Sequence, residues 1–222
     1  SLMYRVIGDS IWGWHLSALL FRIAGAVAFY CILLLAWPKL KALATLTAMV
    51  FVVFPGFLAE PNAATKINHL IGYSAALFSI AFTLVSLKTS RLKWKAASLG
   101  LALFLMAIYV WLYEYMIGLE VMRVTLVYWA LPRGRRETLA ASFRKMLRVY
   151  LPFMGVIGLF LIWRVFLFDS SRSATDMRGL AVIYYADFLS MTLRLVFQVV
   201  KDFLSAALFA WFAQPHRLLA AA

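Results

Sequence analysis

Two carboxylates and one arginine form the densest group of ionisable residues in the apolar part of the sequence. Glu114, Glu120 and Arg123 all lie within one long apolar stretch. A charge in a bilayer costs about 2.5 kcal/mol or more, so such charges mark a packed interior or a functional site. Glu114 and Glu120 are the candidate catalytic residues, since a carboxylate can act as a general base or bind a polar group. The alternative is a structural ion pair of Glu120 with Arg123, spaced i,i+3 on one helix face, beside a solvated Glu114.

The candidate substrate-binding residues are His15, Arg22 and His69, together with Arg123. Arg22 follows His15 by seven residues, which places both on one stripe of a helix that could face a polar cavity open to the outside. The alternative for Arg22 is that its long side chain reaches the lipid headgroups. His69 lies beside Asn68 at the start of another apolar stretch.

The sequence has no spacing of His, Cys and carboxylate residues that is typical of a metal cage. It also lacks a phosphate-binding glycine loop and the sharp turn that presents a nucleophilic serine. No metal site and no cofactor are therefore predicted. The carboxylates of Glu114 and Glu120 are residue types that can bind a divalent cation, but no further ligand in the sequence supports one.

A stripe of polar residues interrupts the last apolar region. Asp187, Arg194 and Lys201 recur every seven residues, with Gln198 and Asp202 close to the same line. Seven residues make almost two helical turns, so these side chains share one face. We expect this face to contact protein outside the sequence and treat the five as candidate partner-contact residues. The alternative is an amphipathic helix that lies in the membrane interface.

The composition of the chain indicates a membrane protein. Of the 222 residues, 65% are hydrophobic and 14% are charged, and the mean hydropathy is +0.88. Soluble domains have about 45–50% apolar and about 25% charged residues. A soluble fold, a disordered segment and a cytosolic nucleic-acid-binding domain are therefore excluded. The net charge of +13 is typical of basic membrane loops, and the expected partner is the lipid bilayer rather than nucleic acid.

The apolar stretches predict an all-α, polytopic transmembrane helix bundle that forms one integral-membrane unit of six or seven spans. A crossing needs about 20 apolar residues, so the stretch 96–131 is divided at a polar tip containing Glu114 and Glu120. Apolar residues at helical spacing, opposite a basic face, predict a cytoplasmic amphipathic helix over 138–149. The expected spans are 12–37, 43–59, 67–87, 96–113, 115–131, 150–168 and 180–212.

The basic residues predict how these spans are oriented. Three basic segments, at 39–41, 88–95 and 133–148, alternate along the chain with connections that contain few basic residues. Cytoplasmic loops collect Lys and Arg, so we assign the basic segments to the cytoplasm. The N-terminus and the tip with Glu114 and Glu120 then face the exoplasm of a multi-pass protein of the cell membrane.

Three short motifs lie at the predicted outer ends of the spans. They are Trp12-Gly13-Trp14-His15 with Leu16, Leu19, Leu20 and Arg22 behind it, Phe54-Pro55-Gly56-Phe57 leading to Asn68-His69, and Tyr113-Glu114-Tyr115-Met116-Ile117-Gly118-Leu119-Glu120 followed by Arg123. Over residues 8–165 the chain resembles the membrane glycosyltransferases of the GT-C fold. More narrowly, it is similar to bacterial inner-membrane proteins related to the protein mannosyltransferases.

The resemblance implies transfer of a sugar from a polyprenyl-phosphate carrier to an acceptor on the exoplasmic face. In that fold the catalytic acid belongs to the first exoplasmic loop, and Asp9 lies too close to the first predicted helix to match it. We therefore expect a fragment of a longer chain, completed by its missing part or by other membrane subunits. The alternative function is a non-catalytic accessory subunit of a larger membrane complex. A transporter ranks last, because the sequence shows no pair of corresponding broken helices.

Overall fold

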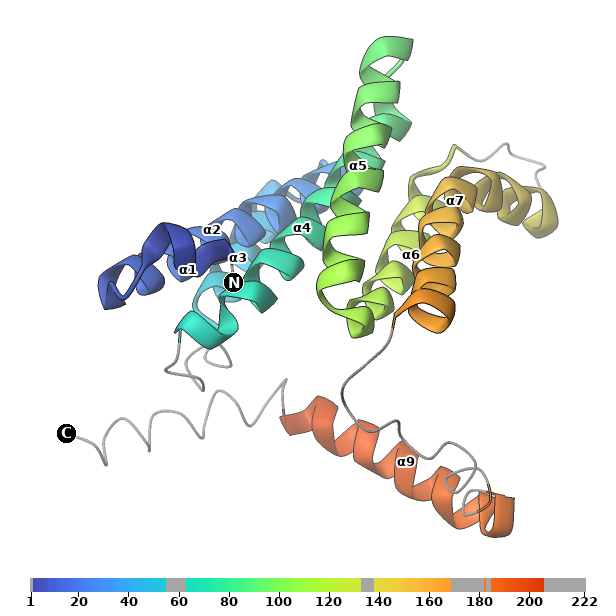
Figure 1. The fold of residues 1–222 in the computed structure, drawn as a ribbon. Helices are drawn as coiled ribbons and strands as arrows, with labels where there is room; N and C mark the ends of the chain where they lie inside the picture. Colours follow the sequence, from blue (N-terminus) through green and yellow to red (C-terminus); the bar gives the residue numbers. More distant parts are fainter. Residues whose placement is uncertain (1, 55–62, 133–137, 169–181, 183–184, 206–222) are drawn as a thin grey trace. The chain divides into compact units, whose positions relative to one another are not determined.

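The computed structural model describes residues 2–54, 63–132, 138–168, 182 and 185–205, and this part of the chain is all-α (Figure 1). The described residues form eight α-helices, one 3-10 helix (η2) and one π-helical segment (η3). The chain divides into two compact units: the first contains the elements from α1 to η3, and the second contains α9. In chain order the elements are α1 (Leu2–Ile7), α2 (Ile11–Ala36), α3 (Lys41–Val52), α4 (Ala63–Lys88), α5 (Leu92–Leu112), η2 (Glu114–Leu119), α6 (Glu120–Ala130), α7 (Leu139–Ile162), η3 (Trp163–Leu167) and α9 (Phe188–Leu204).

The start of α2 is defined by a glycine turn and a serine cap. Gly8, at φ +62°, supplies the left-handed turn after α1, which glycine adopts without strain. Ser10 then caps α2 by accepting a hydrogen bond from a backbone N–H in its first turn at 3.1 Å. The Trp14 indole N–H donates to the Gly8 carbonyl at 3.0 Å. These contacts begin the long apolar helix one turn before His15.

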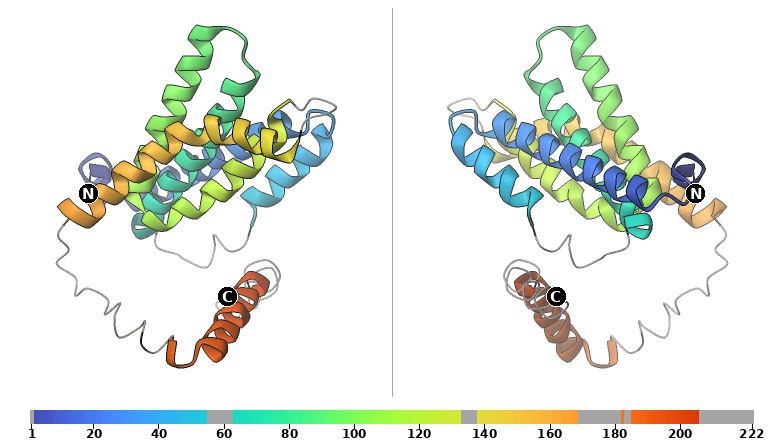
Figure 2. Two further views of the ribbon diagram at one scale, coloured as in Figure 1. Left: turned by 90° about the vertical axis from the view of Figure 1, so that its right-hand side faces the viewer. Right: turned by 90° about the vertical axis from the view of Figure 1, so that its left-hand side faces the viewer.

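Helix α3 turns back along α2, and α4 then runs parallel to α2 (Figure 2). The parallel direction follows from two hydrogen bonds between the helices, which lie 14 residues apart along both α2 and α4. The Ser74 hydroxyl donates to the Phe21 carbonyl at 2.6 Å, and the Lys88 ammonium donates to the Leu35 carbonyl. The N-terminal ends of α2 and α4 therefore lie at the same end of the first unit.

Helices α4 and α5 form an antiparallel pair, in which the Ser79 hydroxyl donates to the Ala102 carbonyl at 2.5 Å. At Tyr113 the backbone becomes extended, and η2 and α6 follow. Helix α6 packs against α4 and α7. Near the C-terminal ends of α5 and α7, the rings of Trp111 and Phe160 lie 5.3 Å apart. The break after α5 thus places η2 beside the end of α7.

Helix α4 is the central helix of the first unit and lies between α2 and α5 (Figure 1). In its most apolar 18-residue stretch 61% of the residues are buried, against 22% or less in the other three candidate spans. Two apolar clusters meet on it, one shared with α5 and α7 and the other with α2 and α6. Ala75, Ala76 and Ala81 are buried on α4, and small residues of this kind let neighbouring helices approach closely.

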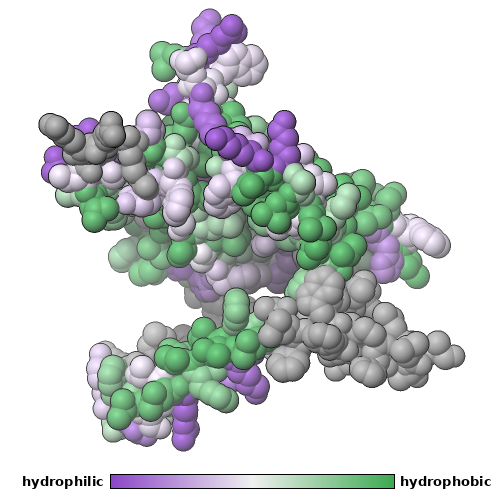
Figure 3. Space-filling view, turned by 180° about the vertical axis from the view of Figure 1, so that it is seen from behind, coloured by the Kyte–Doolittle hydropathy of each residue, from purple (hydrophilic) through white to green (hydrophobic). Residues whose placement is uncertain are grey.

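Large apolar side chains cover the outer surface of these helices. Leu20 is 58% exposed, and Phe104 and Leu159 are each 64% exposed; hydrophobic side chains occupy much of the face drawn in Figure 3. Such a surface is unfavourable in water and suits a lipid environment. Among the described residues, the helices long and apolar enough to cross a membrane are Ile11–Ala36, Lys66–Lys88, Leu92–Leu112 and Leu139–Leu167. Their length and composition indicate a multi-pass membrane protein.

The expectation of six or seven spans is wrong, because the described residues contain four long apolar helices. Helix α3 has 12 residues and α6 has 11. At about 1.5 Å per residue they reach about 18 Å or less, well short of about 30 Å of hydrocarbon. Of the predicted span 180–212, α9 accounts for 17 residues; residues 180, 181, 183, 184 and 206–212 lie outside the described ranges.

The predicted amphipathic segment 138–149 and the predicted span 150–168 meet in one continuous helix, α7. Thr138 caps its start, accepting a hydrogen bond from the Ala141 N–H at 3.3 Å. The helix bends between its olive and orange parts (Figure 1), close to Pro152. A proline inside a helix has no N–H for the preceding turn, which is a common cause of such a bend. The basic half of α7 thus takes a different direction from its apolar half.

Candidate functional site

Arg123 is fully buried inside the first unit. It stands on α6 one turn after Glu120, with exposed fractions of 0% for Arg123 and 4% for Glu120. Ser79 and Thr83 reach it from α4, and Tyr109 reaches it from α5. We call these five residues the Arg123 cluster. Because an unpaired charge in an apolar interior is very costly, the hydrogen-bond partners of this arginine decide what the cluster can do.

Every N–H group of the Arg123 guanidinium has an acceptor. Nε lies 3.0 and 2.9 Å from the two carboxylate oxygens of Glu120. Nη1 donates to the Ser79 carbonyl at 3.1 Å and to Thr83 Oγ1 at 2.5 Å. Nη2 donates to Ser79 Oγ at 2.7 Å and to the Tyr109 hydroxyl at 3.3 Å. The Tyr109 hydroxyl donates in turn to Glu120, which is thereby held away from solvent.

Helix α7 closes the cluster with an aromatic ring. The guanidinium carbon of Arg123 lies 4.3 Å from the ring centroid of Phe153, within the range of a cation–π interaction. Together with Phe153, the cluster therefore joins four helices, α4, α5, α6 and α7. The i,i+3 spacing correctly indicated the pairing with Glu120, whereas the sequence reasoning missed Ser79, Thr83 and Tyr109. A usable signal was present, since hydroxyl residues at 79, 83 and 86 mark one face of an otherwise apolar helix.

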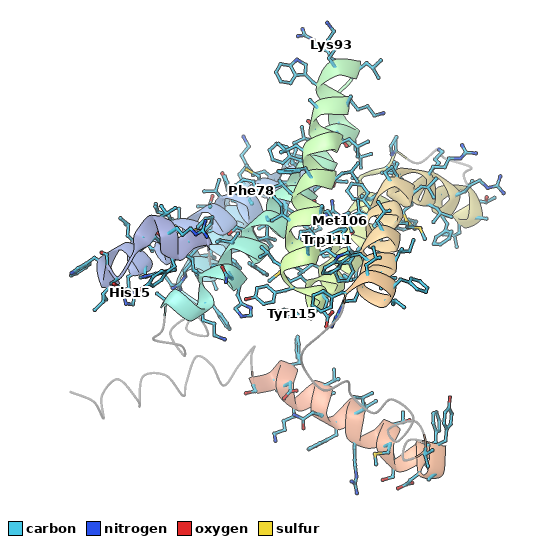
Figure 4. All side chains as sticks on the ribbon, viewed as in Figure 1. His15, Phe78, Lys93, Met106, Trp111 and Tyr115 are labelled. Carbon is cyan, nitrogen blue, oxygen red and sulfur yellow. The ribbon has the colours of Figure 1, made fainter. Side chains whose placement is uncertain are left out.

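A second group of polar and aromatic residues lies where α4, η2 and η3 meet, and we call it the tip cluster. The ring of His69 stacks on Tyr113, with centroids 4.0 Å apart and planes 12° from parallel. His69 Nδ1 lies 2.5 Å from the Tyr115 hydroxyl oxygen. Arg164 Nε donates to Glu114 Oε2 at 2.9 Å. Figure 4 shows Tyr115 and Lys93 at opposite ends of the α5 region.

The tip cluster differs from the Arg123 cluster in its exposure. The side chain of Glu114 is 59% exposed and that of Arg164 is 36% exposed. An ion pair at such a surface contributes about 0–1 kcal/mol, so a ligand can replace either partner at little cost. Partial desolvation and the neighbouring Tyr113 raise the pKa of the Tyr115 hydroxyl above its ordinary value. The tip cluster thus offers an accessible carboxylate, a hydroxyl donor and aromatic rings.

The other candidate residues lie elsewhere in the chain. His15 is exposed on α2, at a distance from Tyr115 in the view of Figure 4. Arg22 is half-buried, one residue after the Phe21 carbonyl that binds Ser74. The structure therefore brings Glu120 to Arg123, and it brings His69 to the segment that contains Glu114. The candidate partner-contact residues Asp187, Arg194, Gln198, Lys201 and Asp202 lie on or directly before α9 in the second unit.

Within the described ranges, no three His, Cys, Asp or Glu side chains are grouped so that they could hold a metal ion. The four long apolar helices of the described residues and their apolar exterior indicate an α-helical multi-pass membrane protein. Comparisons of the chain with protein-family models, with curated proteins and with solved structures found no match.

Proposed function

We propose that this chain is a multi-pass protein of the cell membrane that acts as a GT-C-type glycosyltransferase. It would transfer a sugar from a polyprenyl-phosphate carrier to a hydroxyl acceptor on the exoplasmic face. The observation that carries the proposal is the tip cluster, in which the exposed Glu114 carboxylate pairs with Arg164 while its chain neighbours Tyr113 and Tyr115 contact His69. Aromatic faces and a few polar groups are the usual lining of a small-molecule site.

The distribution of charge supports the proposed orientation. The ends of α2 and α4 and the starts of α3 and α5 hold a group of basic residues, while the tip cluster lies at the other end of α4 and α5. Since cytoplasmic segments are enriched in Lys and Arg, this basic end would face the cytoplasm and the tip cluster the exoplasm. The basic residues are Lys39, Lys41, Lys88, Arg91, Lys93 and Lys95.

The two candidate catalytic carboxylates differ in their availability. Glu120 is 4% exposed and is bound by Arg123 and Tyr109, so no acceptor hydroxyl can reach it in this conformation. Glu114 is exposed and has a weak ion pair with Arg164. A general base must lie within hydrogen-bond reach of the proton that it removes. We therefore assign the base to Glu114 and a positioning role to Glu120.

In the proposed reaction, the oxygen of the acceptor hydroxyl attacks the anomeric carbon of the sugar, and Glu114 accepts the proton of that hydroxyl. The bond between that carbon and the phosphate oxygen breaks, and its electron pair leaves with the polyprenyl phosphate. Arg164 would leave its ion pair with Glu114 and bind the phosphate group of the carrier instead, because the geometry of a guanidinium matches that of a phosphate. His69 and Tyr115 would bind sugar hydroxyls, and the carboxylate would stabilise the positive charge that develops at the anomeric carbon.

The test uses the full chain in phospholipid nanodiscs with radiolabelled polyprenyl-phosphate mannose and a serine-containing peptide as acceptor. Binding of the carrier and release of labelled mannose from the carrier onto the peptide are measured separately. We expect Glu114→Gln to lower the release rate by about 100-fold or more, the usual effect of losing a general base, with carrier affinity changed less than about twofold. The matched control is Asp202→Asn on α9, which should leave the rate unchanged.

Two results would contradict the proposal. If the wild-type chain does not bind the carrier, the site has a different ligand. If Glu114→Gln and Asp202→Asn release mannose at the same rate as the wild-type chain, Glu114 is not the base.

An accessory subunit is the second candidate function, and the Arg123 cluster favours it. A buried ion pair whose donors are all satisfied by its own bundle acts as a structural tie. Under this alternative the tip cluster is a structural contact. The purified chain would then show no carrier binding, and in native membranes it would be recovered in a complex of fixed stoichiometry.

A further inference from the structure

Helix α9 is strongly two-sided. It has 17 residues, from Phe188 to Leu204. At about 100° per residue, its charged side chains and Gln198 occupy about a third of the circumference. Apolar residues fill most of the remaining arc: Phe188, Leu189, Leu193, Leu195, Val196, Phe197, Val199, Val200, Phe203 and Leu204. One wide apolar arc therefore runs along the helix, and a narrow polar stripe runs beside it from Arg194 to Asp202, with Asp187 directly before the helix.

The apolar arc of α9 is exposed along its full length. Leu189 is 70% exposed near the start, Phe197 is 69% exposed near the middle and Phe203 is 68% exposed near the end. No residue of the helix is buried. Contact of such an arc with water is unfavourable, so an apolar medium must cover it. The described residues of the same chain include four helices that suit a membrane span, so a bilayer is the apolar medium that lies nearby.

Charge argues against α9 as a span. Within the described residues, its 17 helical residues extend about 25 Å, against a hydrocarbon thickness of about 30 Å. A crossing would also place Arg194 and Lys201 at membrane depth, where charged groups are strongly disfavoured. In the plane of the surface, by contrast, the stripe faces the headgroups while the apolar arc enters the acyl region.

The polar stripe has little need of a protein partner. Gln198 Nε2 donates to Asp202 Oδ1 at 2.8 Å within the helix. The cations Arg194 and Lys201 are balanced by Asp187 and Asp202, so the stripe has no net charge. A helix without excess positive charge relies on its buried apolar area rather than on attraction to anionic lipids.

We propose that α9 lies flat in the bilayer interface, with its apolar arc among the acyl chains and the stripe from Asp187 to Asp202 at the headgroups. The occupant of the exposed arc is lipid, and zwitterionic lipid is sufficient. This proposal does not depend on the enzymatic function proposed above.

The test measures immersion depth in the full chain. Single cysteines replace Leu189, Val196 and Phe203 on the arc and Gln198 on the stripe, each in a Cys31→Ser background. The proteins are spin-labelled in phosphatidylcholine nanodiscs, and relaxation by oxygen is compared with relaxation by a water-soluble nickel complex. A label at Val27, which is 49% exposed near the middle of α2, is the matched control for a spanning helix.

We expect the three arc positions to share one depth of about 5–10 Å, with position 198 accessible to nickel and position 27 much deeper. Phosphatidylglycerol at 30% should leave the depths unchanged. A depth profile with position 196 at the bilayer centre and positions 189 and 203 near opposite surfaces would overturn the proposal in favour of a span. Arc positions shielded from both relaxants would overturn it in favour of a protein contact.

Discussion

At Arg123, the cost of burying a charge is offset by a complete set of partners. Glu120 neutralises the guanidinium, three side chains and one carbonyl accept its remaining protons, and Phe153 covers one face. Breaking a buried pair by removing one partner costs about 3–5 kcal/mol, whereas replacing both by apolar residues is often neutral. The cluster should therefore tolerate joint replacement better than a single substitution.

We predict that Arg123→Met destabilises the chain by about 3–5 kcal/mol, because it leaves the Glu120 carboxylate buried without its cation. The double variant Arg123→Met/Glu120→Leu should recover most of this loss. Unfolding in mixed micelles with increasing SDS fraction measures both. A double variant that is less stable than the single variant would show that the hydrogen bonds of Glu120, rather than its charge, hold the helices.

The exposed ion pair at the tip cluster should behave differently. Arg164→Met and Glu114→Gln are expected to change stability by less than about 1 kcal/mol, since the pair is open to solvent. The same SDS titration measures this. A loss of about 3 kcal/mol in either variant would show that the tip cluster is a structural contact, as the accessory-subunit alternative requires.

At the scale of elements, the close approach of α2 to α4 depends on a glycine. A Cβ at Gly25 would lie 3.1 Å from Ser74 Oγ, which is itself held by its hydrogen bond to the Phe21 carbonyl. By contrast, a Cβ at Gly100 on α5 would meet no atom within 4 Å. Both glycines lie in long apolar helices, but only Gly25 faces a neighbouring helix at close range.

We therefore predict that Gly25→Leu destabilises the chain by about 1–3 kcal/mol through overpacking. The matched variant Gly100→Leu should be neutral or slightly stabilising, because leucine is a better helix former than glycine. SDS titration compares the two. Equal stability of both variants would mean that α2 and α4 can separate without loss, contrary to the packing described above.

At the scale of the whole molecule, the directions of the helices predict which segments share a side of the membrane. We expect cysteines at Lys39 and Lys93 to react with a membrane-impermeant maleimide from the same side, in a Cys31→Ser background. A cysteine at Tyr115 should react only from the other side, because it lies at the opposite end of α5 (Figure 4). Labelling of sealed, right-side-out vesicles before and after permeabilisation checks this. If the cysteines at positions 39 and 93 react from opposite sides of the membrane, the proposed orientation is wrong, and the exoplasmic position of the tip cluster is wrong with it.

The sequence by itself indicated the class of protein and one of its ion pairs. With 65% hydrophobic residues gathered in long apolar stretches, the chain suits lipid, where a helix satisfies its backbone hydrogen bonds within its own segment. The i,i+3 spacing of Glu120 and Arg123 was sufficient to predict their pairing, because neighbours on one helix face are fixed by helix geometry alone.

Only the tertiary structure decided how long the helices are and which residues meet. The apolar stretches that begin at Lys41 and at Glu120 form short helices, which hydropathy cannot reveal because the same apolar residues suit a short helix and a full span. Ser79 and Tyr109 meet Arg123 from two other helices, and Arg164 meets Glu114 across 50 residues of chain. Contacts over such sequence distances follow from the packing of whole helices, and no local pattern encodes them.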